Sequence, residues 1–354
     1  MAFTRLATIV SLALGLIERA TCTNGKTAGN AVCCPLFDAV DFLQTNLFDG
    51  GECGEEAHSA LRLTFHDAIE FSIHGGMGGG ADGSILVFNA TELQFHANRG
   101  IDDITSRQFP VFQALNEQSG LSGGDFVHLA GAVGTANCPG APRLEFMLGR
   151  LAPVAPAPDL TIPEPTDTVT AILARFADAG FSPEEVIVLL SSHTIAAADD
   201  IDTTIPGTPF DSTVNTFDTQ IFLEVLLKGT LFPGNDPQPG EITSPIAGEM
   251  LLQSDFLLSQ DSRTACFLAV HDNQERMTTQ FKAAMAKLQT LGQNTASLVD
   301  CSDVIPVPAP FPGPIKFPPS FSKADLQIAC TQEAFPSLAT VAGPAPTLAP
   351  VPAS

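Results

Sequence analysis

The sequence predicts a mainly α-helical protein with two lobes. Apolar residues recur at helical spacing in seven segments, whereas the alternation that is typical of strands is scarce. A mature chain of roughly 330 residues exceeds the usual size of one domain. Five prolines between Pro153 and Pro165 interrupt the helical pattern near mid-chain, which favours a connector between two halves. The seven helical segments are expected at 35–48, 55–69, 124–136, 167–179, 183–192, 220–228 and 273–291.

The composition divides the chain into four parts. Residues 1–20 have the layout of a secretory signal peptide, with Arg5 followed by an apolar stretch from Leu6 to Ile17. That stretch is shorter than the about 20 residues that span a bilayer, and no later segment suits a membrane span. We expect one lobe at 21–160, a second lobe at 161–303 and a Pro-rich extension at 304–354. The Ala/Pro end of this extension, from Ala342 onward, should be extended or disordered.

Eight cysteines all follow the predicted signal peptide. An even number of cysteines in an exported chain favours four disulfides, although the count alone leaves their pairing open. Metal binding is the alternative, but the sequence has no C-x-x-C pair, and adjacent Cys33 and Cys34 can hardly ligate one tetrahedral zinc ion. The sequon that begins at Asn89 predicts one N-linked glycan.

The chain is strongly acidic, with a formal net charge of −23 and a pI near 4.4. Such a field repels nucleic acid and anionic membranes, so neither is expected as a partner. It attracts cations instead. We predict a secreted monomer.

Four residues with polar or ionisable side chains lie on one face of the second predicted helix. Glu55, Ser59, Arg62 and His66 recur at steps of four, three and four. A core histidine bonded to a backbone carbonyl is the plain structural interpretation of His66. A buried arginine one turn away argues against it, because guanidinium keeps its charge and needs an anionic partner. A neutral imidazole that accepts a proton, beside a fixed cation, suits cleavage of a peroxide O–O bond.

That chemistry needs an electron reservoir, which protein side chains alone do not provide. A haem is therefore implied, with His193 as its iron ligand. A ligating histidine usually donates its other N–H to a carboxylate, and Asp255 is our candidate for this acceptor. A helix cap is the alternative role for Asp255.

The glycine-rich run from Gly75 to Gly80 is similar to a phosphate-binding loop only superficially, because the Lys-Ser/Thr ending of that motif is missing. The Asp82-Gly83-Ser84 sequence that follows offers a carboxylate, a hydroxyl and accessible carbonyls. These oxygen ligands suit a hard cation.

The chain resembles the secreted fungal haem peroxidases that include manganese, lignin and versatile peroxidases. The resemblance covers about Cys22 to Cys330. It rests on five motifs, which are Arg62-Leu63-Thr64-Phe65-His66-Asp67, Gly80-Ala81-Asp82-Gly83-Ser84, Cys138-Pro139-Gly140-Ala141-Pro142-Arg143, Ser192-His193-Thr194 and Asp211-Ser212-Thr213.

The resemblance implies a two-lobed helical peroxidase fold with haem b between a distal lobe (21–160) and a proximal lobe (161–303). It places Arg62, Phe65 and His66 on the peroxide side of the haem, and His193, Phe210 and Asp255 on the other side. By the same match, Asn98 holds His66 through its second ring nitrogen, and Glu92 supports that arrangement.

Two calcium sites and four disulfides also follow from the resemblance. One calcium site matches Asp67, Gly80, Asp82 and Ser84. The other matches Thr194, Asp211, Thr213, Thr216 and Asp218. Ordinary surface turns are the alternative for both acidic loops. The implied disulfides are Cys22–Cys34, Cys33–Cys301, Cys53–Cys138 and Cys266–Cys330.

The sequence departs from the family pattern at two positions that concern the reductant. Manganese peroxidases bind Mn²⁺ with three carboxylates and a haem propionate, whereas here Glu55 and Asp199 match two of those positions and Ser59 the third. We therefore expect weakened Mn²⁺ oxidation, because a neutral serine attracts Mn²⁺ less than a carboxylate does. In the alternative, Glu55 and Asp199 are only solvated surface acids. Val188 matches the exposed tryptophan of lignin and versatile peroxidases, and the chain has no Trp and no Tyr.

The function that we expect is a hydrogen-peroxide-dependent haem peroxidase that takes single electrons from small phenols and aromatics, and less efficiently from Mn²⁺, in lignin degradation. A full manganese peroxidase is the nearest alternative. Two alternatives come from other classes: a zinc hydrolase that uses His66, Asp67 and His193, and a haem carrier without turnover, which would not explain Arg62.

Overall fold

The computed structural model describes residues 19–269, 273–332 and 334–352, and within these it is mainly helical. The predicted signal peptide lies almost entirely outside the described residues. The α-helices of the described chain are α1 (Leu36–Asn46), α2 (Glu55–Ala68), α3 (Ser84–Val87), α4 (Asn89–Glu92), α5 (Asp102–Ser119), α6 (Gly123–Ala136), α7 (Val169–Asp178), α8 (Pro183–Leu189), α9 (Gln220–Glu224), α10 (Gln253–Gln260), α11 (Ala265–Ala269) and α12 (Gln274–Leu288).

Short elements connect these helices. The 3₁₀ helices are η1 (Ala31–Cys33), η2 (His96–Asn98), η3 (Leu190–Ile195), η4 (Thr295–Ser297), η5 (Ser302–Val304) and η6 (Lys323–Asp325). Strands of two residues form antiparallel pairs, which are β1 (Ala20–Thr21) with β2 (Thr27–Ala28), β3 (Met147–Leu148) with β8 (Val299–Asp300), β4 (Ala197–Ala198) with β5 (Thr208–Pro209), and β6 (Glu241–Ile242) with β7 (Leu251–Leu252). The prediction of a mainly α-helical fold is confirmed, and each of the seven expected segments contains a helix.

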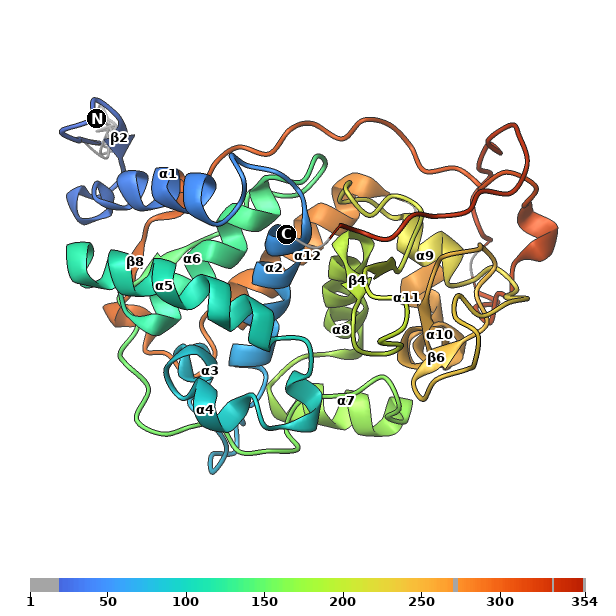
Figure 1. Ribbon diagram of the computed structural model, residues 1–354, viewed down its shortest axis with the longest axis horizontal. Coiled ribbons are helices and arrows are strands. Elements are labelled where there is room, and N and C mark those ends of the chain that lie inside the picture. The colour runs from blue at the N-terminus through green and yellow to red at the C-terminus, as the bar shows by residue number, and fades with distance from the viewer. Residues whose placement is uncertain (1–18, 270–272, 333, 353–354) are drawn as a thin grey trace, which may run out of the picture.

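Helices from the two halves of the sequence occupy different sides of the molecule (Figure 1). Helices α1, α2, α5 and α6 lie on one side, and α8 to α11 lie on the other. The segment between them, 153–165, has no helix or strand, as the proline content predicts. The expected division at 160/161 stays a prediction.

Helices α2 and α6 pack against each other and form the framework for the first half of the site. Every residue of α6 is buried, and its apolar side chains continue the hydrophobic core. A Cβ atom at Gly131 would overlap the methyl group of Thr64, and one at Gly134 would press on the α2 backbone at Ala57. Glycine at these positions therefore lets the two helices approach closely enough to fix the orientation of the α2 side chains.

A capping box begins α8 and leads the chain toward His193. Ser182 Oγ accepts from Glu185 N (3.2 Å), and Glu185 Oε2 accepts from Ser182 N (2.8 Å). Lys287 of α12 donates to both carboxylate oxygens of Glu185 at 2.9 Å. Helix α8 then tightens into η3, which carries His193.

Four disulfides occur in the structure, in the pairs that the resemblance implied. They are Cys22–Cys34, Cys33–Cys301, Cys53–Cys138 and Cys266–Cys330. Cys33–Cys301 joins positions 268 residues apart and fixes the beginning of the C-terminal extension to the N-terminal region. Arg143 also attaches the beginning of the extension, because its guanidinium donates to the backbone oxygens of Ile305 and Asp303.

The C-terminal extension runs across the molecule from one half to the other (Figure 1). Most of it is extended, and two backbone hydrogen bonds hold its end: Leu348 N donates to Ala247 O (2.8 Å), and Val351 N donates to Gly207 O (2.7 Å). The tail is therefore extended but attached, rather than free. None of the helices in the described chain has the length and apolar character that a membrane span requires.

Candidate functional site

Helix α2 presents the predicted face, and its last turn carries His66. The ring Nδ1 of His66 lies 2.9 Å from Asn98 Oδ1, and because an amide oxygen only accepts, Nδ1 is the protonated nitrogen. Asn98 in turn donates through Nδ2 to the backbone oxygen of Glu92 (3.0 Å). Glu92 therefore supports the arrangement through its backbone, while its Oε1 accepts from Ala157 N. The unprotonated ring nitrogen of His66, which carries the lone pair, is therefore Nε2.

Burial makes His66 a neutral imidazole. Burial, assisted by the charge of Arg62, lowers the pKa of His66 to about 3. Arg62 Nε donates to the lone pair of His66 Nε2 at 3.3 Å. The unprotonated nitrogen of His66 thus lies next to a permanent cation, and it can accept a proton from a molecule bound beside both.

The Arg62 side chain keeps exposed surface, yet desolvation lowers the pKa of its guanidinium. This combination is expected for a side chain that borders an internal space. Its Nη2 donates to Arg99 O (2.8 Å) and its Nη1 to Gly100 O (3.3 Å). The carboxylates of Asp200, Asp199 and Glu55 favour its charged form, in that order. The sequence analysis missed Asp200, which adjoins Asp199.

Phe65 completes this side of the site. Its ring stacks on Phe176 of α7 with centroids 5.5 Å apart, and it meets the ring of His66 edge-on at 5.8 Å. Phe176 also packs edge-on against Phe181. These contacts fix the position of Phe65 beside the histidine and arginine.

His193, on η3, is the centre of the second half of the predicted site. Its Nδ1 lies 2.7 Å from Asp255 Oδ2, so Nδ1–H donates a hydrogen bond to the carboxylate. Nε2 is then the unprotonated nitrogen. The Phe210 ring lies 5.3 Å from the His193 ring, tilted by 48°. Asp255 is buried, whereas the side chain of His193 is 28% exposed. A histidine held in one tautomer with its other nitrogen accessible suits an axial ligand of haem iron.

The three residues predicted for Mn²⁺ are only partly assembled. Ser59 Oγ donates to Glu55 Oε1 at 2.9 Å, and Asp199 Oδ1 accepts from Gly207 N at 2.8 Å. Burial and, to a smaller extent, the nearby charge of Asp199 together raise the pKa of Glu55 to about 7. Glu55 and Asp199 therefore act on one another, which does not favour independent surface acids.

The first predicted calcium site lies where α2 meets the glycine-rich loop. Asp67 Oδ2 accepts from Gly83 N (3.0 Å), and Asp82 Oδ1 accepts from Ser84 N (2.9 Å). Gly80 adopts a φ of +79°, which glycine tolerates, and packs against the backbone of Leu291. Asp67 Oδ1 is buried with no hydrogen-bond partner among the described residues. Buried oxygen ligands with an unused lone pair fit a hard cation.

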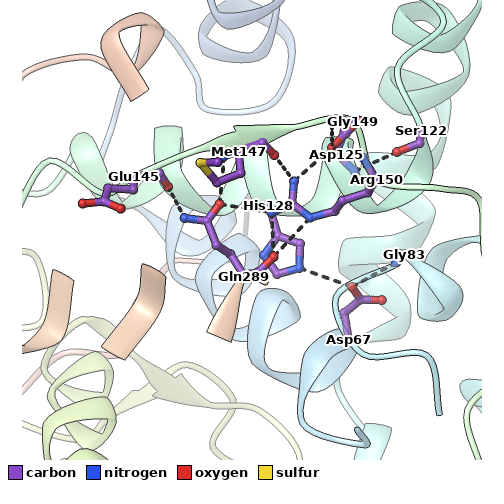
Figure 2. Close-up of polar contacts among 10 residues, drawn as sticks. All are labelled: Asp67, Gly83, Ser122, Asp125, His128, Glu145, Met147, Gly149, Arg150 and Gln289. Carbon is purple, nitrogen blue, oxygen red and sulfur yellow. Dashed lines mark hydrogen bonds and ion pairs between the residues drawn. The ribbon is translucent and has the colours of Figure 1, made fainter. Parts of the chain in front are cut away.

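A buried network supports Asp67 from the side of α6 (Figure 2). His128 Nε2 lies 3.4 Å from Asp67 Oδ2. Arg150 pairs with Asp125 (2.9 Å) and donates to the backbone oxygen of Gln289 (2.8 Å), and its charge offsets part of the burial cost of Asp67. This network adjoins Asp67 on the side of Oδ2, and Oδ1 has no hydrogen-bond partner in the described chain.

The second predicted calcium site brings all five of its residues together. Thr194 Oγ1 donates to Asp211 Oδ2 (2.5 Å) and lies 3.3 Å from Asp218 Oδ1 and 3.5 Å from Thr216 O. Thr213 Oγ1 lies 3.2 Å from Asp211 Oδ1 and 3.1 Å from Asp218 Oδ1. Burial and the charge of Asp218 raise the pKa of Asp211 well above its ordinary value. A divalent cation would neutralise this pair of carboxylates.

Other predicted residues occupy ordinary positions. Asn89 begins α4 and is partly exposed, and its glycosylation stays a prediction. Val188, the counterpart of the exposed tryptophan, is 2% exposed. The zinc-site alternative gains no support, because His66 and Asp67 have separate partners. Within the described chain, the compact group of metal-binding residue types is Cys53, His58 and Cys138, whose cysteines form a disulfide.

An oxidoreductase that uses hydrogen peroxide with the help of haem is the class that this fold and site define. Comparison with known proteins agrees. The peroxidase family model matches residues 40–274, and a model of the fungal peroxidase extension region matches residues 276–353.

Several relatives among known proteins are similar along the whole chain. A versatile peroxidase of Pleurotus eryngii is 51% identical and a manganese peroxidase of Phlebia radiata is 50% identical, each over 100% of both chains. A ligninase of Phanerodontia chrysosporium is 45% identical over 99% of both chains. The chain belongs to this family of fungal haem peroxidases. Membership implies haem and calcium as cofactors, and it leaves the reducing substrate open.

Proposed function

We propose that this chain is an extracellular peroxidase of lignin degradation whose reductants are small phenols and aromatics and, with reduced efficiency, Mn²⁺. The two halves of the molecule would correspond to a distal lobe at 21–160 and a proximal lobe at 161–303. The Pro-rich extension from 304 would hold them together.

In the proposed mechanism, His66 is the base. Its Nε2 takes a proton from hydrogen peroxide, while Asn98 keeps the proton on Nδ1 and so keeps the ring in the accepting tautomer. Arg62 stabilises the negative charge that develops on the departing oxygen. The proton taken by His66 is then available to that oxygen, which leaves as water.

The opposite half would hold the haem. His193 Nε2 would ligate the iron, and Asp255 would make the imidazole a stronger electron donor through the 2.7 Å hydrogen bond at Nδ1. The haem would supply the redox chemistry: it would give two electrons to peroxide and regain them one at a time from the reductants. Phe210 would pack beside His193 and restrict its ring.

One observation supports the choice of reductants: the place of a third manganese carboxylate is taken by Ser59, which donates a hydrogen bond to Glu55 instead of offering a charge. Two carboxylates give Mn²⁺ a weaker site than three. High-potential aromatics at the surface are disfavoured, because the chain has no Trp or Tyr and Val188 is buried. Small phenols that reach the haem edge need no such relay.

Steady-state assays with Mn²⁺, a simple phenol and a non-phenolic aromatic, run side by side, test this proposal. We expect turnover of the phenol, slower turnover of Mn²⁺ with a high KM, and negligible turnover of the non-phenolic compound. Efficient oxidation of the non-phenolic compound would contradict the proposed substrate range.

Introducing the missing carboxylate with Ser59→Glu should raise kcat/KM for Mn²⁺ by about tenfold or more, since an additional anionic ligand worth about 1.4 kcal/mol changes an equilibrium tenfold. The matched control is Ser59→Gln, which has a similar size and no charge, and it should give no increase. Turnover of the phenol should be the same in all three proteins. Unchanged Mn²⁺ kinetics in Ser59→Glu would show that the site is placed wrongly.

A further inference from the structure

Glu70 is a buried carboxylate that neither the sequence analysis nor the proposed mechanism uses. It follows the end of α2 and lies one helical turn beyond Asp67. Its exposure is 0%, and Oε2 has no hydrogen-bond partner within the described part of the chain. Its Oε1 accepts from Ser84 Oγ at 3.3 Å, the hydroxyl of the first predicted calcium site. Glu70 therefore reaches the same place as Asp67, Asp82 and Ser84.

The charges around Glu70 make its burial costly. Burial removes the hydration of its carboxylate, and the charges that act on it most, those of Asp67, Glu92 and Asp82, all have the same sign as its own. Protonation could remove the charge, but a proton on Oε2 would then lack an acceptor in the surrounding protein. A buried carboxylate without a basic side chain is otherwise stabilised by a metal ion.

The glycine-rich loop is shaped around these acids. A Cβ atom at Gly78 would overlap the side chain of Glu70, and one at Gly79 would overlap the carboxylate of Asp82. Gly78 N also donates to Glu70 O (3.3 Å). The loop backbone thus approaches both carboxylates closely, and two buried oxygens, Asp67 Oδ1 and Glu70 Oε2, remain unpartnered in the described structure.

We propose that Glu70 is a ligand of the calcium ion at this site, a third carboxylate beside Asp67 and Asp82 that binds the ion directly through its free oxygen. The inference rests on the proposed calcium site and deepens it. A third anionic ligand makes the site net negative even with Ca²⁺ bound, which strengthens binding and slows release of the ion. The second site, around Thr194 and Asp211, has no part in this effect and provides an internal reference.

The test measures calcium release from the fully loaded holoenzyme. Wild type and Glu70→Gln are mixed with an excess of a chromophoric chelator, and the release of the two ions is followed with time, after the calcium content has been measured by elemental analysis. We expect Glu70→Gln to release one ion about tenfold faster or more, with the other ion unchanged, and isothermal titration of the depleted proteins to show the matching loss of affinity at one site.

The matched control is Glu241→Gln. Glu241 is also buried, with a raised pKa and an unpartnered Oε2, but it lies on β6 and accepts from Gln238 N. The Glu241→Gln protein should release both calcium ions at the wild-type rates. Asp67→Asn, which removes a predicted ligand, should resemble Glu70→Gln.

Two results for Glu70→Gln would overturn the proposal. Release from Glu70→Gln at the wild-type rate, or more slowly, would mean that Glu70 is a neutral acid outside the coordination sphere. Faster release of both ions would point to a general loosening of the fold. If Asp67→Asn accelerates calcium release and Glu70→Gln does not, the calcium site stands and only the role of Glu70 fails. If elemental analysis finds no calcium in the wild-type protein, the site itself is refuted.

Discussion

Replacing His66 with Leu should slow the reaction of the resting enzyme with hydrogen peroxide by about 10²–10⁴-fold, the range that a positioned general base contributes. The reason is the neutral Nε2 beside Arg62, which no other histidine in the described site offers. The measurement is the second-order rate constant from stopped-flow absorbance of the haem.

The pH profile distinguishes loss of the base from a structural defect. Because burial lowers the pKa of His66 to about 3, the wild-type rate constant should stay level as pH falls from 7 and decline only near pH 3. His66→Leu should lack this decline. The control is His58→Gln, a buried histidine of the same helix whose pKa burial lowers to about 4 and whose Nε2 lies 3.6 Å from Cys53 Sγ. A wild-type decline centred near pH 6.5, or a normal rate in His66→Leu, would contradict the role of His66.

Removing calcium should have the largest effect on stability. A ligand at a thousand times its Kd stabilises the folded state by about 4 kcal/mol per site, so loss of two ions should lower Tm by more than about 10 °C. The structural reason is the concentration of buried carboxylates, with Asp67 and Asp82 at one site and Asp211 and Asp218 at the other. Differential scanning calorimetry with and without a chelator measures this change.

The calcium-free protein should also become less stable as pH rises. Burial raises the pKa of Asp82 and of Glu92 to about 7. A carboxyl whose pKa is raised on folding contributes stability at low pH that is lost as pH increases through the folded value, here near 7. The chelated protein should therefore lose Tm between pH 5 and pH 8, whereas the calcium-loaded protein should not. Equal Tm values with and without chelator at pH 8 would contradict both sites.

Helix prediction succeeded where apolar periodicity is strong and failed where it is weak. Helices α2, α6 and α12 follow apolar residues at helical spacing, so their positions could be predicted. Helix α5 was missed, because Pro110 lies inside it and many of its residues are polar. Helices α3, α4 and α11 have four or five residues each, too few for a periodic signal.

Local spacing also explains how much of the site could be predicted. Arg62 and His66 share one helix, so their proximity follows from their separation. The contact between His193 and Asp255 joins residues 62 positions apart, so helical spacing cannot show it; the usual carboxylate partner of a ligating histidine and the family resemblance pointed to Asp255. Glu70 and Asp200 were missed because their importance comes from burial among other charges, which depends on tertiary packing. For Glu70 a weak signal was available: it lies one turn after Asp67 and shortly before the glycine-rich run.

The central claim is that His193, held by Asp255, ligates a haem that faces Arg62 and His66. The most direct measurement is the electron paramagnetic resonance spectrum of the ferrous nitric oxide complex, recorded for wild type and for His193→Ala after haem content has been determined. We predict one haem per chain and an axial nitrogen splitting that is present in wild type and absent in His193→Ala. A wild-type protein that binds no haem, or a splitting that persists in His193→Ala, would contradict this account.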